Sequence, residues 1–430
     1  MLTSTGGTRA AYVPAMRAPV VPESSSARSL GWLALLVVVV PLTTACALGD
    51  RGDADPSDDT DPSDPADPSD DSEPSDPSGD DSLQGGWKVV LAEGAAPIRS
   101  ITRRSDGLLI GPRSSGHTIE VWTSANEGVS WTRAGTVASH PDVGFGDVTM
   151  LRAPGTTTIF CAFREEIAGT FRVTVTRSTD DGRTWSYDST PVPAGTLFVG
   201  APFLFMRANG DLQIYYDSEP IAAAHGKPGH QWIAMRGRKG LTGPWTHYGE
   251  TIVSRETAPG ALSREGMPTV VQLGGDRVMV VVEGVEPFPT GGARANLIHA
   301  TQSLDGGRTW VASLRRTVYR SFVHQGTQQR YNAYAPYAVR VGGGPVGVAF
   351  CTDERTDGAL PDAANAPVHL RRCRVGYVQT TTSFESWSAP SPVWTATSKN
   401  YTPGLFERAS NQVIVTIDAF AGKQRILARP

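Results

Sequence analysis

The 430-residue sequence predicts an all-β fold, namely a six-bladed β-propeller that follows a disordered N-terminal tether. Three observations support this prediction. A turn motif recurs in nearly the same form at three places, a pattern of two strands recurs six times between residues 100 and 420, and that region has no convincing helical stretch. Six repeats of about four strands each are typical of a propeller, whereas a two-sheet sandwich would not explain six matched hairpins.

The N-terminal residues have the features of a secretory signal. An apolar run over residues 29–45 follows Arg28 and ends in small residues, and its apolar core is too short to span a bilayer as a helix. Cys46 comes directly after this run, in a context that resembles the lipobox of bacterial lipoproteins. We therefore expect residues 1–45 to be a signal peptide and Cys46 to be lipidated. The protein would then be extracellular and anchored to the cell membrane through its lipid alone; plain secretion is the alternative.

Residues 46–84 have the composition of a disordered linker. Between residues 50 and 82 the chain repeats Asp-Pro-Ser and carries 14 acidic residues against one arginine, so it cannot bury apolar surface and its charges repel one another. We expect this linker to tether a propeller formed by residues 85–430. The propeller region carries 35 lysines and arginines against 28 acidic residues but has no basic stripe. We therefore expect no nucleic-acid partner, and we expect a monomer.

The propeller region contains three cysteines, and an odd number in an exported domain leaves at least one free thiol. Cys351 and Cys373 flank a long connection in the fifth repeat, so we expect them on neighbouring strands as candidate disulfide partners. Cys161 should then be a buried free thiol. No cysteine or histidine spacing indicates zinc, and we expect neither a metal nor a cofactor.

The turn motif has the form Ser-x-Asp/Asn-x-Gly-x-x-Trp, and its copies span residues 124–131, 178–185 and 303–310. In such a hairpin the Asp or Asn side chain bonds turn amides, the glycine takes a positive φ, and the tryptophan packs back onto the sheet. The motif resembles the Asp-box of sialidases and related propellers, which lies at the rim. We therefore expect Asp180 and Asp305 to support stability and not catalysis.

The two-strand pattern consists of an apolar strand, a turn rich in Gly, Asn and Asp, and a second apolar strand that ends in charged residues. Its six copies span residues 100–113, 146–164, 200–219, 266–286, 334–354 and 401–420. The sixth copy leaves room for only three strands before the C-terminus, and the segment WKVVLAE at residues 87–93 can supply the fourth. We therefore expect residues 84–100 and 401–430 to share a blade and close the ring.

Propeller geometry predicts where functional groups gather. In an antiparallel blade the start of the innermost strand and the end of the second strand lie on the same face, so charged residues at these places surround one mouth of the channel. The residues at these places are Arg113, Arg164, Glu165, Glu166, Asp217, Glu219, Arg264, Glu265, Glu283, Glu286, Tyr331, Asn332, Tyr334, Asp353, Glu354 and Asp418. Any one of them alone is most often only solvated. Together, carboxylates, arginines and tyrosines at one mouth suit glycoside chemistry, in which one carboxyl group protonates the leaving oxygen and another attacks or activates water.

Three segments resemble the matching blades of the exo-α-1,5-arabinanases of glycoside hydrolase family 93, a branch of the sialidase-like propellers. They are residues 200–219, 263–273 and 332–354, which share the Gly-x-Pro strand starts and the Thr-Asp-Glu end of the fifth blade. The resemblance implies a retaining hydrolase with two catalytic glutamates, and Glu219 and Glu283 best match that pair by position. We expect the substrate to be bound beside them by Arg113, Arg164, Asp217, Arg264, Glu265, Asn332, Tyr334, Asp353 and Glu354.

The sequence therefore predicts a secreted or cell-surface exo-acting glycoside hydrolase that removes a terminal sugar unit from a glycan, with an arabinan-like substrate favoured. One alternative is a sialidase, although the Ile-Pro half of the sialidase Arg-Ile-Pro motif is absent. The candidates for its arginine cluster and tyrosine nucleophile are Arg99, Arg113, Arg264, Arg340, Tyr334 and Tyr401. The other alternative is a non-catalytic sugar-binding propeller, which is favoured if Glu219 and Glu283 lie far apart or are neutralised by arginines.

Overall fold

All residues that the computed structural model describes belong to the second of the chain's two units, Glu73–Pro430. They are residues 86–91, 99–255, 264–286, 295–327, 329–355, 360–361, 373–381, 384–398, 402–409, 412–419 and 423–429. The predicted signal peptide, the linker and Cys46 lie outside these ranges. Within them, no helix is long and apolar enough to cross a membrane.

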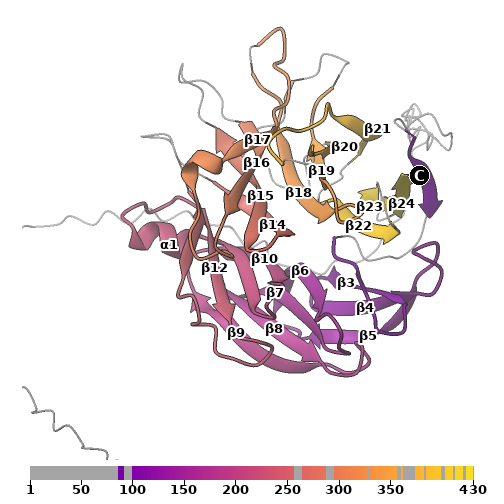
Figure 1. The fold of residues 1–430 in the computed structure, drawn as a ribbon, viewed down its shortest axis with the longest axis vertical. Coiled ribbons are helices and arrows are strands. Elements are labelled where there is room, and N and C mark those ends of the chain that lie inside the picture. Colours follow the sequence, from indigo (N-terminus) through magenta and orange to yellow (C-terminus); the bar gives the residue numbers. More distant parts are fainter. Residues whose placement is uncertain are drawn as a thin grey trace, which may run out of the picture. The chain divides into compact units, whose positions relative to one another are not determined.

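Six four-stranded antiparallel sheets follow one another along the chain, so the prediction of an all-β propeller is confirmed (Figure 1). From the innermost strand outwards, blade one consists of β2 (Thr102–Arg103), β3 (Leu109–Ser115), β4 (Thr118–Ser124) and β5 (Thr132–Ser139). Blade two consists of β6 (Gly144–Arg152), β7 (Ile159–Ile167), β8 (Thr170–Ser178) and β9 (Ser186–Gly195). Blade three consists of β10 (Val199–Met206), β11 (Leu212–Ser218), β12 (Trp232–Arg238) and β13 (Thr251–Ser254). A single short helix, α1 (Glu219–Ala224), follows β11.

Blades four to six repeat the same order. Blade four consists of β14 (Gly266–Gly274), β15 (Arg277–Glu286), β16 (Ala295–Ser303) and β17 (Arg316–Tyr319). Blade five consists of β18 (Ala333–Arg340), β19 (Val346–Thr352), β20 (Cys373–Gln379) and β21 (Ser391–Ser398). Blade six consists of β22 (Gly404–Ala409), β23 (Gln412–Ala419), β24 (Lys423–Arg429) and β1 (Lys88–Leu91). The 3₁₀ turn η2 (Ala312–Leu314) comes just before β17. Each blade packs its apolar face on its neighbours, which builds the core from buried strand residues.

The N-terminal strand completes the sixth blade, as the sequence predicts. β1 pairs with β24, with Lys88 opposite Ala428, and Figure 1 shows the indigo β1 beside β24. On one side Trp87 packs edge-on against Tyr377 of blade five, with ring centroids 5.6 Å apart. On the other side a guanidinium N–H of Arg103 in blade one donates to the backbone oxygen of a blade-six strand residue, at 3.3 Å. The ring therefore closes through a sheet built from both ends of the propeller region.

The inner strands of blades two to five share one irregularity near their start. The residues there have left-handed φ values although they are not glycine: Asp147 (54°), Ala201 (40°), Met267 (55°) and Ala335 (52°). The ladder register shifts at each of these places, which marks a β-bulge. Such a conformation costs about 1–2 kcal/mol for a residue with a Cβ atom, so something else in each blade must compensate for it.

The strand pairing in blade five shows how Cys351 lies relative to Cys373, its predicted disulfide partner. Val375, not Cys373, lies opposite Cys351. Diagonal neighbours that are two residues out of step lie about 7–8 Å apart, at the limit for a disulfide. The side chain of Cys373 lies outside the described part of the chain, so this bridge remains a prediction. Cys161 is a buried free thiol, as expected.

The Asp-box turns have the predicted hydrogen bonds. In the third copy the hydroxyl of Ser303 donates to Oδ1 of Asp305 at 2.7 Å, and the Thr309 N–H and hydroxyl donate to the same carboxylate at 2.9 and 2.6 Å. The second copy repeats this pattern around Asp180. Because the turn connects the third and fourth strands of its blade, it belongs to the outer half of the blade.

Replacing Asp305 with Ala should lower stability without affecting chemistry at the mouth. The change removes the acceptor of three hydrogen bonds, and we expect a loss of about 1–3 kcal/mol in the free energy of unfolding. Denaturant unfolding measures this loss, with the exposed Asp142→Ala as control. A folded Asp305→Ala protein that had lost its activity at unchanged stability would contradict the placement of this turn.

Candidate active site

Three carboxylates meet at one mouth of the propeller, and each is held by the next blade. They are Asp147 on β6, Asp217 on β11 and Glu283 on β15. The left-handed residues of the bulges donate their N–H groups to them: Ala201 to Asp147 (3.2 Å), Met267 to Asp217 (3.0 Å) and Ala335 to Glu283 (2.6 Å). Each bond satisfies a backbone N–H that the bulge removes from the ladder, so these bonds help to compensate for the strained backbone.

One backbone position recurs on the second strand of each blade. In blades two to five, Arg164, Asp217, Glu283 and Cys351 lie opposite Gly146, Gly200, Gly266 and Tyr334. Asp217 is therefore the positional equivalent of Glu283. Glu219 lies two residues further on, at the first position of α1, which corrects our expectation that Glu219 and Glu283 end equivalent strands.

Glycine at the paired position leaves room for the carboxylates. A Cβ atom on Gly266 would lie 3.2 Å from Oδ2 of Asp217 and 3.5 Å from Oε1 of Glu283. These two oxygens are therefore less than about 7 Å apart, close enough for each carboxyl group to affect the charge state of the other. Gly200 serves Asp147 in the same way, with a Cβ position 3.2 Å from Oδ2. The first glycine of the Gly-x-Pro motif is thus needed for space, since its own φ is not positive.

Asp217 is the most deeply buried of the three. Its residue is 4% exposed, while Glu283 is half-buried and the Asp147 side chain is 25% exposed. Burial, together with the neighbouring charges of Asp147 and Glu283, raises the pKa of the Asp217 carboxyl group well above its ordinary value. The carboxyl groups at this mouth therefore differ both in burial and in the charges around them.

Arg164 is brought to the mouth as predicted, but it is fully engaged there. Its Nε donates to Asp147 at 3.0 Å and its Nη1 to Glu166 at 2.8 Å. Its guanidinium also lies 5.7 Å from the ring centre of Phe198. Asp147 itself was not among the predicted site residues. The signal for it is the second copy of the strand pattern, which has an acidic residue where the next three copies have Ala, Met and Ala.

Glu219 is connected to the carboxylate cluster through two polar side chains. Its Oε1 lies 3.4 Å from Nη1 of the half-exposed Arg264, and its Oε2 accepts the N–H of Phe198 at 3.2 Å. Arg264 also donates to Oε1 of Gln231 at 2.8 Å, and Gln231 donates to Asp217 at 3.3 Å. The predicted residues Asp217, Glu219, Arg264 and Glu283 therefore do lie together, and Gln231, which the sequence did not indicate, connects them.

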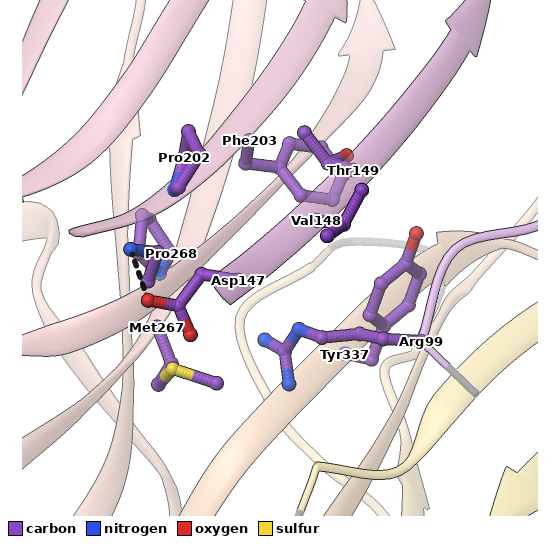
Figure 2. A pocket seen from close by; sticks show the side chains of 10 residues that line it. Arg99, Asp147, Val148, Thr149, Pro202, Phe203, Met267, Pro268 and Tyr337 are labelled. Atoms are coloured by element: carbon purple, nitrogen blue, oxygen red, sulfur yellow. Dashed lines mark hydrogen bonds between the residues drawn. The ribbon is translucent and has the colours of Figure 1, made fainter. Parts of the chain in front are cut away.

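A small pocket continues from the carboxylates into the channel between the inner strands. It is lined by Asp147, Met267, Phe203, Tyr337 and Arg99, among others (Figure 2). The dashed line in Figure 2 is the bond that Asp147 accepts from blade three. Arg99 donates to the backbone oxygen of a blade-five residue at 3.0 Å, and its guanidinium lies 5.4 Å from the ring centre of Tyr337.

Several predicted substrate-binding residues are buried in structural contacts instead. Glu265 is 2% exposed and pairs with Arg315 at 2.5 Å. Asn332 and Asp353 are 2% and 1% exposed, and the Asn332 amide donates to the Asp353 carboxylate at 2.8 Å. Because these polar groups satisfy one another inside the protein, they stabilise the wall of the propeller rather than offering a surface to a sugar.

The remaining predicted substrate-binding residues have other surroundings. Glu354 accepts the Tyr319 hydroxyl at 2.6 Å and the Phe322 N–H at 2.8 Å, in a groove away from the carboxylate cluster. Tyr334 is 1% exposed and packs in an apolar cluster. Arg113 is half-buried on β3. Among the described residues, no group of three or more His, Cys, Asp and Glu side chains is arranged to hold a metal ion.

No protein-family model and no curated protein sequence matches the chain. Solved structures match most of its length. The family 93 α-L-arabinofuranosidase of Fusarium graminearum, with arabinobiose, is 16% identical over 80% of this chain and 98% of that chain, with a TM-score of 0.54. The α-L-arabinanase of Penicillium chrysogenum, also with arabinobiose, gives the same values. A Hadza microbial sialidase is 18% identical over 80% of this chain and 68% of that chain, with a TM-score of 0.53. The fold is therefore that of the sialidase-type propellers and is similar to that of family 93.

Replacing Gly266 with Ala should disturb the carboxylate cluster. The new Cβ atom would lie 3.1 Å from Nε2 of Gln231 and close to both carboxylates, so we expect a loss of about 1–3 kcal/mol in unfolding free energy from overpacking. Gly135→Ala is the matched control, because no atom lies within 4 Å of its Cβ position. Equal unfolding free energies for the two variants would contradict the proximity of the carboxylates to Gly266.

Proposed function

We propose that this protein is an exo-acting glycoside hydrolase that removes a terminal sugar unit from a glycan by a retaining two-carboxylate mechanism. The observation that supports it most directly is the cluster of carboxyl groups at one mouth. Asp217 and Glu283 lie less than about 7 Å apart there, and Glu219 is linked to Asp217 through Arg264 and Gln231. Crowded carboxyl groups in different surroundings have pKa values that differ widely, so one can hold a proton while its neighbour is ionised. Glycoside hydrolysis requires both states at once.

Glu219 and Glu283 remain our assignment for the catalytic pair. Both are half-buried rather than buried, so a sugar can reach them, whereas Asp217 is almost completely covered. One of the pair protonates the leaving oxygen, and the other attacks the anomeric carbon to form the covalent intermediate that water then releases. Arg264 lies at the mouth between Glu219 and Gln231, where it holds Glu219 in place.

An arabinan-like substrate is favoured among glycans. Two proteins with this fold were solved with arabinobiose. A panel of aryl glycosides that includes arabinofuranosides and a sialoside tests the choice, because release of the aryl group from one member identifies the sugar. Selective cleavage of the sialoside would favour the sialidase alternative. Against that alternative, Arg340 is engaged by the backbone oxygens of Gln272 and Leu273.

The second candidate function is sugar binding without catalysis. The ion pair between Arg264 and Glu219, together with the bond from the Phe198 N–H, occupies both oxygens of one of the proposed catalytic carboxylates. Binding of an arabinan oligosaccharide without release of any product from the panel would favour this function.

We also propose that Cys46 carries a lipid that anchors the mature protein to the outside of the cell membrane. The Cys46→Ala protein should lose metabolic labelling by a fatty acid and move from the membrane fraction to the medium or the soluble fraction. Cys161→Ala serves as the control, since that thiol is buried in the propeller. Equal membrane retention of Cys46→Ala and the parent would contradict lipid anchoring.

Removing either catalytic carboxylate should reduce turnover sharply. We expect Glu219→Gln and Glu283→Gln each to lower kcat by about 100-fold or more on a substrate that the parent cleaves, which is the usual contribution of an acid or base. Glu120→Gln is the control, because that residue pairs with Arg133 on blade one. Near-normal turnover in either variant would remove that residue from the catalytic pair.

A further inference from the structure

Asp217 differs from Asp147 and Glu219, each of which pairs with an arginine, because the groups that donate to Asp217 in the described structure are neutral. Its Oδ1 accepts the N–H of Met267 at 3.0 Å, and its Oδ2 accepts Nε2 of Gln231 at 3.3 Å. Arg264 is not bonded to Asp217. It donates to Oε1 of Gln231 at 2.8 Å, and Gln231 lies between the two residues. The same arginine faces Glu219, the next carboxylate along the chain, at 3.4 Å. Within the described ranges of the chain, no guanidinium therefore contacts the most buried carboxyl group of the mouth.

The other charged groups that face Asp217 are carboxylates with stabilising partners of their own. Asp147, from β6, is bonded by Nε of Arg164 at 3.0 Å. Glu283, from β15, accepts the N–H of Ala335 at 2.6 Å and is half-buried. If the cluster as a whole takes up one proton, the buried group without a cation is the place where that proton is held most favourably.

We infer that Asp217 holds a proton at neutral pH and acts as a positioning residue, an uncharged acid that lets Asp147 and Glu283 remain ionised beside it. The bonds from Met267 and Gln231 fix its carboxyl group, and in its uncharged state this group does not repel Glu283. When Asp217 loses its proton at higher pH, three anions crowd the same wall and Glu283 is repelled from its position. The consequence for catalysis rests on the proposed function, while the protonation state does not.

The protonation state can be observed directly on the full propeller labelled with ¹³C at the aspartate carboxyl carbon. We expect one resonance of the parent to titrate well above the ordinary range of aspartate and to disappear in Asp217→Asn. The exposed Asp142→Asn is the matched control, which should leave the high-titrating resonance in place. A parent without a high-titrating resonance, or an Asp217→Asn protein that keeps it, would overturn the inference, whether or not the protein cleaves any glycoside.

Stability gives a second measurement that does not need a substrate. The pKa of Asp217 is higher in the folded than in the unfolded protein, so its contribution to stability is complete at low pH and is lost as the pH rises through the folded pKa. The midpoint of thermal unfolding of Asp217→Asn relative to the parent should therefore rise as the pH increases, while that of Asp142→Asn should not. A constant difference across the pH range would overturn the inference.

If a substrate is cleaved, the pH profile separates a positioning role from a merely structural one. We expect the alkaline limb of kcat to move by about one pH unit or more towards higher pH in Asp217→Asn, because the variant cannot acquire the third charge. An unchanged alkaline limb in a folded, active Asp217→Asn protein would overturn the positioning role. If the parent protein cleaves no glycoside, that result counts against the proposed function. The ¹³C titration then still decides whether Asp217 holds a proton.

Discussion

The hydrogen bond from each bulge to the carboxylate of the preceding blade is the interaction on which the mouth depends. Ala201, Met267 and Ala335 adopt a left-handed backbone that residues with a Cβ atom rarely take. Their N–H groups leave the ladder and point to acidic side chains of the preceding blade. Neither half of this arrangement is favourable alone, since the bulge would be strained and the buried carboxylate would lack a donor. Blade packing and the charge of the site are therefore coupled.

The repeat uses one backbone position for different chemistry in each blade. That position holds Arg164, Asp217, Glu283 and Cys351 in turn. The first three lie opposite a glycine, whereas the fourth lies opposite Tyr334, which is buried in an apolar cluster. The glycine and the charged residue consequently form a unit, and the blade with the tyrosine places an apolar cluster at the channel instead.

The sequence was sufficient to predict the fold but only part of the site. Repeated motifs determine the fold, whereas the site also depends on the direction in which each side chain points. Six matched hairpins and three Asp-boxes determine blade number, and the shortage of strands in the last copy predicts the closure by β1. Strand ends, in contrast, give the level of a residue in the blade but not the direction of its side chain. A single bulge reverses which residues face the channel. For this reason Asp217 and Glu283 were predicted correctly to lie at the mouth, whereas Asn332 and Asp353 turned inward, and Asp147 and Gln231 were missed.

The start of α1 explains how blade three presents two carboxyl groups with different properties. Ser218 ends β11 and caps the helix by accepting the N–H of Ile221 at 3.2 Å. The chain leaves the sheet at that point, so Glu219 is carried out to Phe198 and Arg264 while Asp217 stays within the ladder. A buried acid without a cation and a half-buried carboxylate with one are thus two residues apart. Differences in burial and charge of this kind are what separate the protonation states of neighbouring carboxyl groups, and here they accompany the change from strand to helix at Ser218.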